Sequence, residues 1–218
     1  MKWGLFGGTF DPVHFGHLRC AEEILELFEL DKVLFIPARI QPLKTDKTLF
    51  SFYHREQMLK LAIEGNSLFS ISDIENRRSG KSYSIETVRY FIDNSPQGTD
   101  LYFILGQDAF DEITMWKDWK ELIRLCNFVV MTRPGHEIKS PDSIFPADVA
   151  SLFHYDGTAD CFRESGGHSI FFRNLTLLDI SSTDIRNRLK TSRSIRYLIP
   201  DPVRTYILTD RTAKKTKR

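Results

Sequence analysis

The feature that most constrains this chain is the segment Gly7–His17, which reads GGTFDPVHFGH. A short apolar run, Trp3–Phe6, precedes it. After it, apolar side chains recur at helical spacing, at Leu18, Ala21, Ile24, Leu25 and Phe28. The order is therefore strand, glycine turn, helix. Paired glycines let a ligand approach the backbone, and the unpaired N–H groups and positive dipole of a helix N-terminus attract phosphate. The segment predicts a phosphate-binding turn.

Two histidines distinguish this turn from other phosphate loops. His14 and His17 are three residues apart, so they share one face of the helix if it has begun by His14. Imidazoles in that place can donate hydrogen bonds to phosphate oxygens whose charge grows during a reaction.

Other interpretations of the segment stay open. It is not a Walker A loop, because no Gly-Lys-Ser/Thr follows the glycines, and Gly4, Gly7 and Gly8 do not form a GxGxxG pattern. The histidines could share a zinc ion, although the HExxH pattern is absent and Cys20 is the nearest cysteine. They could also simply cap or pack the start of a helix.

Alternating strand and helix patterns predict the fold class. Short continuous apolar runs, typical of strands covered on both faces, lie at Lys32–Pro37, Leu101–Leu105 and Phe128–Met131. Helical stretches lie at Tyr53–Ile63 and Ser84–Ile92, while Phe69–Ile74 alternates like a strand near a sheet edge. Such βα units predict an α/β fold, a Rossmann-like doubly wound parallel sheet with helices on both faces. Ligands bind these sheets beyond the carboxyl ends of the strands.

The composition bounds the class of protein. The 218 residues, 41% of them hydrophobic, suffice for a single domain with a buried core, which we expect over residues 1–211. A formal charge of +1 creates no global field, so neither nucleic acid nor a membrane is expected as a partner. The cysteines lack a CxxC pattern, and no signal-like or membrane-spanning run is present, which predicts a reduced cytoplasmic protein. A homo-oligomer is compatible with these features.

Two segments lack periodicity. Residues 136–174 contain prolines and glycines that mark turns, so we expect an irregular excursion with one short helix near Ala147–Phe153. Residues 212–218 form a basic tail, for which we expect disorder.

Charged and polar residues follow the predicted strands. Asp108 could accept hydrogen bonds from ribose hydroxyls or only cap the next helix. Arg133 lies at a turn where a guanidinium can grip a phosphate. The segment Ser181–Arg186 starts a helix and offers hydroxyls, N–H groups and a guanidinium, so we interpret it as a second anion cradle. The remaining cations after the strands are expected to be solvated, namely Arg39, Arg77, Arg78 and Lys81.

These motifs carry a resemblance. The string GGTFDPxHxGH resembles the signature of the nucleotidyltransferase superfamily that has an HxGH motif, and Ile180–Arg186 is similar to its ISSTxxR motif. From Met1 to about Thr209 the chain resembles the bacterial nicotinate-nucleotide adenylyltransferase family. Pantetheine-phosphate adenylyltransferases and cytidylyltransferases share this front end and remain alternatives within the class, and a nucleotide-sensing module without catalysis is an alternative outside it.

The resemblance implies transfer of an adenylyl group from ATP, accompanied by Mg²⁺, to nicotinate mononucleotide, with deamido-NAD and pyrophosphate as products. No protein metal site is implied. Catalytic roles fall to His14, His17 and Lys44. ATP contacts are implied for Gly7, Gly8, Thr9, Phe10, Gly16, Gly106, Asp108, Ser182, Thr183 and Arg186. Nicotinate mononucleotide contacts are implied for Ser84, Trp116, Lys117 and Arg133, and Ser84 departs from the threonine usual in the family.

Overall fold

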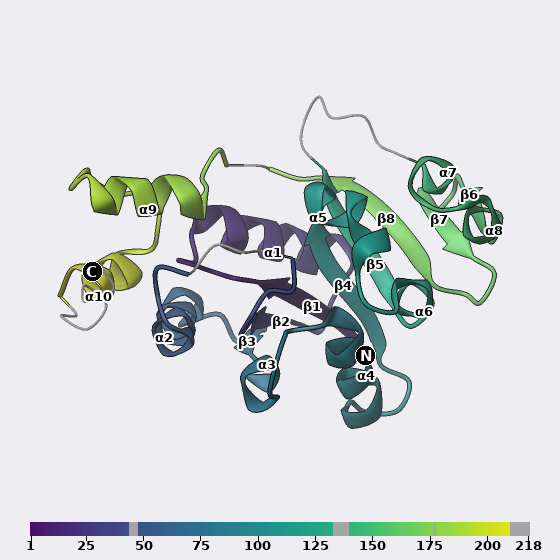
Figure 1. Ribbon diagram of the computed structural model, residues 1–218, viewed down its shortest axis with the longest axis horizontal. Coiled ribbons are helices and arrows are strands. Elements are labelled where there is room, and N and C mark those ends of the chain that lie inside the picture. Colours follow the sequence, from purple (N-terminus) through teal and green to yellow (C-terminus); the bar gives the residue numbers. More distant parts are fainter. Residues whose placement is uncertain (44–47, 133–139, 177, 210–218) are drawn as a thin grey trace.

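The computed structural model describes residues 1–43, 48–132, 140–176 and 178–209. Its strands form one sheet in the order β3-β2-β1-β4-β5-β8-β7-β6 (Figure 1). Neighbouring strands are parallel from β3 to β8, whereas β7 pairs antiparallel with both β8 and β6. The strands are β1 Lys2–Gly8, β2 Lys32–Pro37, β3 Phe69–Ile71, β4 Asp100–Gly106, β5 Asn127–Thr132, β6 Phe153–Asp156, β7 Cys161–Glu164 and β8 Ser169–Asn174.

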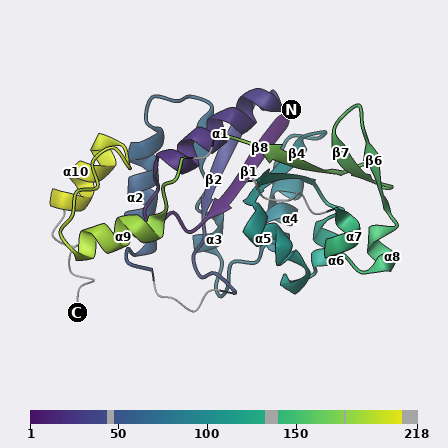
Figure 2. The same ribbon diagram turned by 90° about the horizontal axis from the view of Figure 1, so that it is seen from above.

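Helices cover both faces of this sheet. One core contains Ala21 of α1, Met58 of α2 and Val203 of α10, and the opposite core contains Val88 of α4 and Phe110 of α5. Figure 2 shows α1 on one side of β1 and β4, with α5 and α6 on the other. The predicted doubly wound α/β fold is therefore confirmed. The helices are α1 Phe15–Leu27, α2 Phe52–Ile63, α3 Ile74–Arg77, α4 Ser84–Asn94, α5 Gln107–Asp111, α6 Trp119–Leu122, α7 Pro141–Ile144, α8 Ala147–Ala150, α9 Ser182–Lys190 and α10 Asp201–Thr209, with a 3₁₀ turn at Ile113–Met115.

The strand order determines where a ligand can bind. The chain runs outward from β1 through β2 to β3, then returns to place β4 on the other side of β1. At such a switch point the loops after the two central strands diverge, which opens a crevice at their carboxyl ends. The residues after β1 and β4, which contain the histidine segment and Gly106–Asp108, flank that crevice.

The prediction for residues 136–174 was wrong where the structure describes them. Residues 140–174 form α7, α8 and the strands β6, β7 and β8, and β8 pairs with β5 in the main sheet. The expected helix over 147–153 ends at Ala150, and Phe153 already belongs to β6. The four-residue strands β6 and β7, joined to their neighbours by turns such as the one with Gly166 and Gly167, are too brief to show periodicity. The edge position predicted for Phe69–Ile74 is confirmed by β3.

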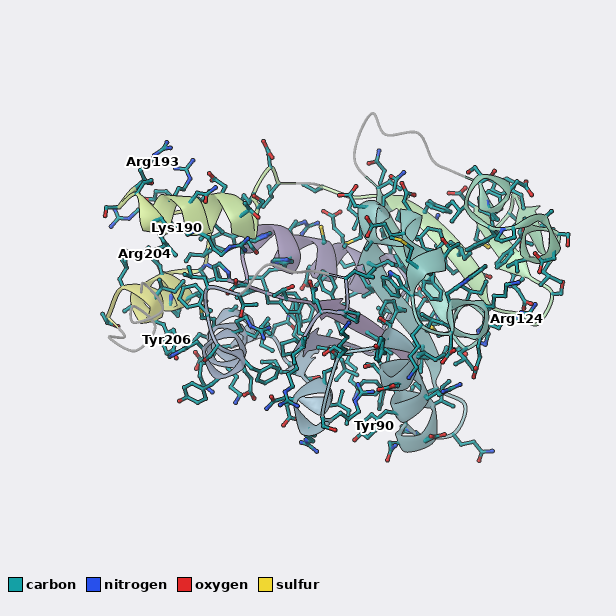
Figure 3. The ribbon with its side chains drawn as sticks, in the orientation of Figure 1. Tyr90, Arg124, Lys190, Arg193, Arg204 and Tyr206 are labelled. Carbon is teal, nitrogen blue, oxygen red and sulfur yellow. The ribbon has the colours of Figure 1, made fainter. Side chains whose placement is uncertain are left out.

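The C-terminal helices extend the molecule beyond the sheet. Figures 1 and 2 show α9 and α10 at the same end as α2. Figure 3 labels Tyr206 on α10, and its hydroxyl lies 2.8 Å from Nδ1 of His54 on α2. The basic tail at 212–218 falls outside the described residues. Within the described part of the chain, no helix combines the length and apolar character needed to span a bilayer.

Candidate active site

The loop after β1 has an unusual backbone. Phe10 has a φ of 49°, in the left-handed region, and its ring is 2% exposed. The ring lies beneath Gly8, where an added Cβ would come within 2.9 Å of it. Gly8 thus allows the loop to fold over Phe10, and Gly7 and Thr9 stay partly exposed above the core.

The two histidines follow this loop as a stacked pair. His14 is the N-cap of α1 and His17 is the third residue of the helix, with ring centroids 3.7 Å apart. A Cβ at Gly16 would lie 3.0 Å from Nδ1 of His14, so the glycine leaves room for that ring. The predicted common face is present, although the helix begins at Phe15, after His14.

Both imidazoles are neutral at pH 7. Burial lowers the pKa of His14 to about 4. Burial, and then the neighbouring His14, hold the pKa of His17 well below 6.5. The backbone N–H of His14 donates to Nδ1 of the His17 ring at 3.3 Å. The proton of the neutral His17 ring therefore lies on Nε2. Nδ1 of His14 is buried and lacks a hydrogen-bond partner among the described residues.

The second anion motif packs directly against the first. Ser182 Oγ donates to the carbonyl of Pro12 at 2.8 Å, and Arg186 Nη1 donates to the carbonyl of Asp11 at 3.0 Å. Arg186 also donates to Oγ1 of Thr183 at 3.0 Å. Figures 1 and 2 place the start of α9 near the start of α1. Residues about 170 apart in sequence therefore form one surface of hydroxyls, imidazoles and a guanidinium.

A third group of candidate residues follows β4, the strand beside β1 in the sheet. Gly106 ends β4, and a Cβ added there would meet no atom within 4 Å, so the space beside it is open to a ligand. Asp108 is exposed in the first turn of α5. Trp116 is partly buried and packs edge-to-face on Phe103, with the ring centroids 6.2 Å apart.

The start of α4 lies close to the segment that carries Trp116. Lys117 Nζ forms a 2.7 Å ion pair with Glu86 and lies 4.7 Å from the ring centroid of Tyr83. Ser84 is the first residue of α4, where the leading N–H groups have no partner within the helix. The structure thus gathers Ser84, Trp116 and Lys117 in one region.

Comparison with known proteins agrees with this arrangement. The cytidylyltransferase-like family model matches residues 5–188. A probable nicotinate-nucleotide adenylyltransferase of Pelobacter propionicus is 45% identical over 95% of both chains, and one of Geobacter sp. strain M21 is 44% identical over the same shares. This chain belongs to the nicotinate-nucleotide adenylyltransferase family.

Solved structures share the fold of this nicotinate-nucleotide adenylyltransferase family member. The nicotinic acid mononucleotide adenylyltransferase of Plasmodium falciparum complexed with NaAD has a TM-score of 0.73 and 20% identity, covering 98% of this chain and 97% of its own. The same enzyme complexed with APC has a TM-score of 0.69 over the same shares.

Two predicted residues of this family member cannot be placed, and two others were overlooked. Lys44 and Arg133 lie outside the described residues. No role was predicted from the sequence for Asp11 or Arg55, although both are buried at the loop after β1. A signal for Arg55 existed, because it lies three and four positions before Met58 and Leu59 and so shares their apolar face.

The arginines expected to be solvated differ from one another. Arg39 is exposed, although its Nη1 donates to the carbonyl of Arg78 at 2.6 Å. Arg78 itself is partly buried and donates to Oγ1 of Thr87 at 2.5 Å, so the prediction of a solvated side chain was wrong there. Its partners on α4 account for the difference, since they offer a hydroxyl and a carboxylate in place of water.

Proposed function

We propose that this chain transfers the adenylyl group of ATP to nicotinate mononucleotide, forming deamido-NAD and releasing pyrophosphate in NAD biosynthesis. An oxygen of the mononucleotide 5′-phosphate forms a bond to the α-phosphorus of ATP. The bond from that phosphorus to the oxygen leading to the β-phosphate breaks, and the electron pair leaves with pyrophosphate. The named relatives, at 45% and 44% identity over 95% of their length, support this assignment.

The observation that carries the proposal is the junction between the two anion motifs. Ser182 and Arg186 contact the backbone carbonyls of Pro12 and Asp11, which lie two and three residues before His14. A triphosphate spans several ångströms and carries its charge along its length, so it needs donors on both sides of the reacting phosphorus. The junction supplies donors from α1 and α9 within one surface.

In this proposal the histidines act as hydrogen-bond donors, with no role as a base. A phosphate monoester has its second pKa near 6, so the attacking group is already largely a dianion at pH 7. Nε2 of His17 donates to a reacting phosphate, and His14 supports it from the helix cap. Ser182, Thr183 and Arg186 receive the pyrophosphate. Lys44, when placed near the phosphates, adds a further positive charge.

The acceptor nucleotide is assigned to the region around the start of α4. The N–H groups at Ser84 suit the pyridine carboxylate, because a helix N-terminus favours an anion. The Trp116 ring stacks on the pyridine, and the Lys117 ammonium, 2.7 Å from Glu86, offsets the negative charge of that carboxylate beside the helix start. Gly106 and Asp108 contact the adenosine side of the crevice, and Arg133 contacts a phosphate.

Enzymes of this kind generally use a divalent metal with ATP, and we propose that the ion here is Mg²⁺ bound to the ATP phosphates. The carboxylate of Asp11 is already used, since its oxygens accept hydrogen bonds from the N–H groups of Leu49 and Phe50 at 2.7 and 2.9 Å. Mg²⁺ readily keeps water and phosphate oxygens as ligands, so it enters with the substrate.

An acceptor panel tests the function. Purified protein is incubated with ATP and Mg²⁺ plus nicotinate mononucleotide, nicotinamide mononucleotide or phosphopantetheine, and pyrophosphate release is measured. We expect the highest kcat/KM with nicotinate mononucleotide. Faster reaction with phosphopantetheine, or ATP binding without turnover on any acceptor, would refute the proposal.

A further inference from the structure

Arg55 on α2 is a buried cation beside the phosphate loop. Its side chain is 1% exposed. One guanidinium nitrogen donates to the carbonyl of Thr9 at 2.6 Å, and another donates to the carbonyl of Ala38 at 2.8 Å. Among the described residues Arg55 forms no ion pair, although the charges of Asp11 and Glu75 act on it from nearby, so two neutral carbonyls are its direct hydrogen-bond partners. Burying a cation in this way is costly, which makes its position informative.

The two carbonyls belong to the loops that leave the central strands. Thr9 follows β1 directly, and Ala38 follows β2 directly. The N–H of Ala38 in turn donates to the carbonyl of Gly8 at 2.8 Å. Arg55 therefore joins the carboxyl ends of β1 and β2 at the point where both chains turn toward the proposed phosphate site.

Arg55 also fixes the backbone carbonyl that precedes Phe10, the residue with the strained backbone. Phe10, with its φ of 49°, occupies a conformation that costs a non-glycine residue roughly 1–3 kcal/mol and persists only when its surroundings enforce it. The carbonyl before it is held by Arg55, and the carboxylate after it, on Asp11, is held by the N–H groups at Leu49 and Phe50. Both restraints come from the segment that opens α2.

The strained residue contacts a catalytic candidate. The Phe10 ring centroid lies 5.0 Å from that of His17, at an interplanar angle of 71°. The backbone conformation of Phe10 therefore determines the position of an aromatic ring that packs against the His17 imidazole. We propose that Arg55 is a positioning residue, which fixes the backbone of Thr9 and the ring of Phe10 so that the His17 imidazole is held in place for phosphoryl chemistry.

An arginine meets this demand better than other residues. Its planar fork presents several N–H donors at fixed angles, so it can hold two carbonyls at once, whereas a lysine ammonium is a point charge on a flexible stem. A methionine of similar length donates no hydrogen bond and leaves both carbonyls unpaired. Arginine, lysine and methionine at position 55 thus offer decreasing numbers of hydrogen bonds to the two carbonyls of the loop.

The kinetic test of this role rests on the proposed function. We compare the wild type with Arg55→Lys and Arg55→Met. The control is Arg163→Met, because Arg163 pairs with Asp156 on the remote strand β6. Misplacing a reacting group by about 1 Å costs on the order of 10²-fold in rate, so we expect Arg55→Met to lower kcat by about that factor and KM for ATP to change far less. Arg55→Lys should recover part of kcat, and the control should keep it. A loss confined to KM, or equal kcat for lysine and methionine, would overturn the role.

A second readout does not need activity. The imidazole nitrogen and carbon resonances of the ligand-free protein are recorded by NMR for each variant, with His168, which lies in the turn between β7 and β8, as internal reference. We expect the His17 signals to shift in Arg55→Met, to shift less in Arg55→Lys, and to stay in place in Arg163→Met, with His168 unchanged throughout. If Arg55→Met does not fold, the comparison of Arg55→Lys with the wild type decides. Unshifted His17 signals would refute the positioning role, even if the wild type proved to use another acceptor.

Discussion

The burial of His14 links the stability of the ligand-free protein to pH. Its pKa is about 4 in the folded protein and 6.5 when exposed, so the unfolded chain binds a proton more readily than the folded one. The resulting stabilisation is complete above pH 6.5 and is lost as the pH falls toward 4. Moving a pKa from 6.5 to 4 corresponds to about 3 kcal/mol over the whole window.

The effect is measurable in a milder range. Relative to high pH, the stability lost at a given pH is RT times the natural logarithm of (1 + 10^(6.5 − pH))/(1 + 10^(4 − pH)). At pH 5 the ratio is about 30, so the free energy of unfolding should fall by about 2 kcal/mol relative to pH 7.5 through this group. His17, whose pKa is also lowered by burial, changes stability in the same direction.

Urea unfolding at pH 7.5 and 5.0 provides the assay, with His14→Asn as the matched variant. Asparagine is a good N-cap and does not titrate, so it removes the proton linkage and retains a capping residue. Titrating groups remote from His14 contribute to both proteins and cancel in the comparison, whereas the pKa of His17 is no longer lowered by His14 in the variant. We expect the wild type to lose about 2 kcal/mol more than His14→Asn between the two pH values. Equal losses would show that His14 is not buried as a neutral ring.

Three substitutions probe the proposed roles directly. His17→Ala should lower kcat by roughly 10² or more in pyrophosphate-release assays, because it removes a donor to the reacting phosphate, and near-normal turnover of the folded variant would contradict that role. Gly16→Ala places a Cβ 3.0 Å from Nδ1 of His14 and should lower kcat about tenfold or more by displacing that ring, whereas an unchanged kcat would mean that its position is irrelevant. Trp116→Leu should raise KM for nicotinate mononucleotide about fivefold and leave KM for ATP unchanged, since a stacked ring contributes about 1 kcal/mol; equal effects on both substrates would contradict its assignment.

Buried parallel strands and amphipathic helices were the easiest elements to predict. The run at Lys32–Pro37 coincides with β2, and the runs at Leu101–Leu105 and Phe128–Met131 fall within β4 and β5. A strand covered on both faces has to be apolar throughout, which makes it visible in sequence. The antiparallel strands β6 and β7 were missed because each has only four residues and few of these are buried, which gives no comparable apolar run.

The chemistry of the anion site is also largely local. A strand, a glycine turn and a helix start place N–H groups, His14 and His17 within one short segment of the sequence. The same holds for Ser182 and Arg186, which lie one turn apart on α9. The donor groups of each half of the phosphate surface therefore lie within one short segment of the sequence and can be recognised there.

Only the tertiary structure decided how these halves meet. The contacts from Ser182 to Pro12 and from Arg186 to Asp11 depend on where the chain returns after β8, which no local pattern contains. The same is true of Arg55, whose partners Thr9 and Ala38 come from two different strand ends. Local sequence preferences determine where helices and strands form and which polar residues follow them. The strand order determines which strand ends become neighbours, and that order depends on packing over the entire sheet.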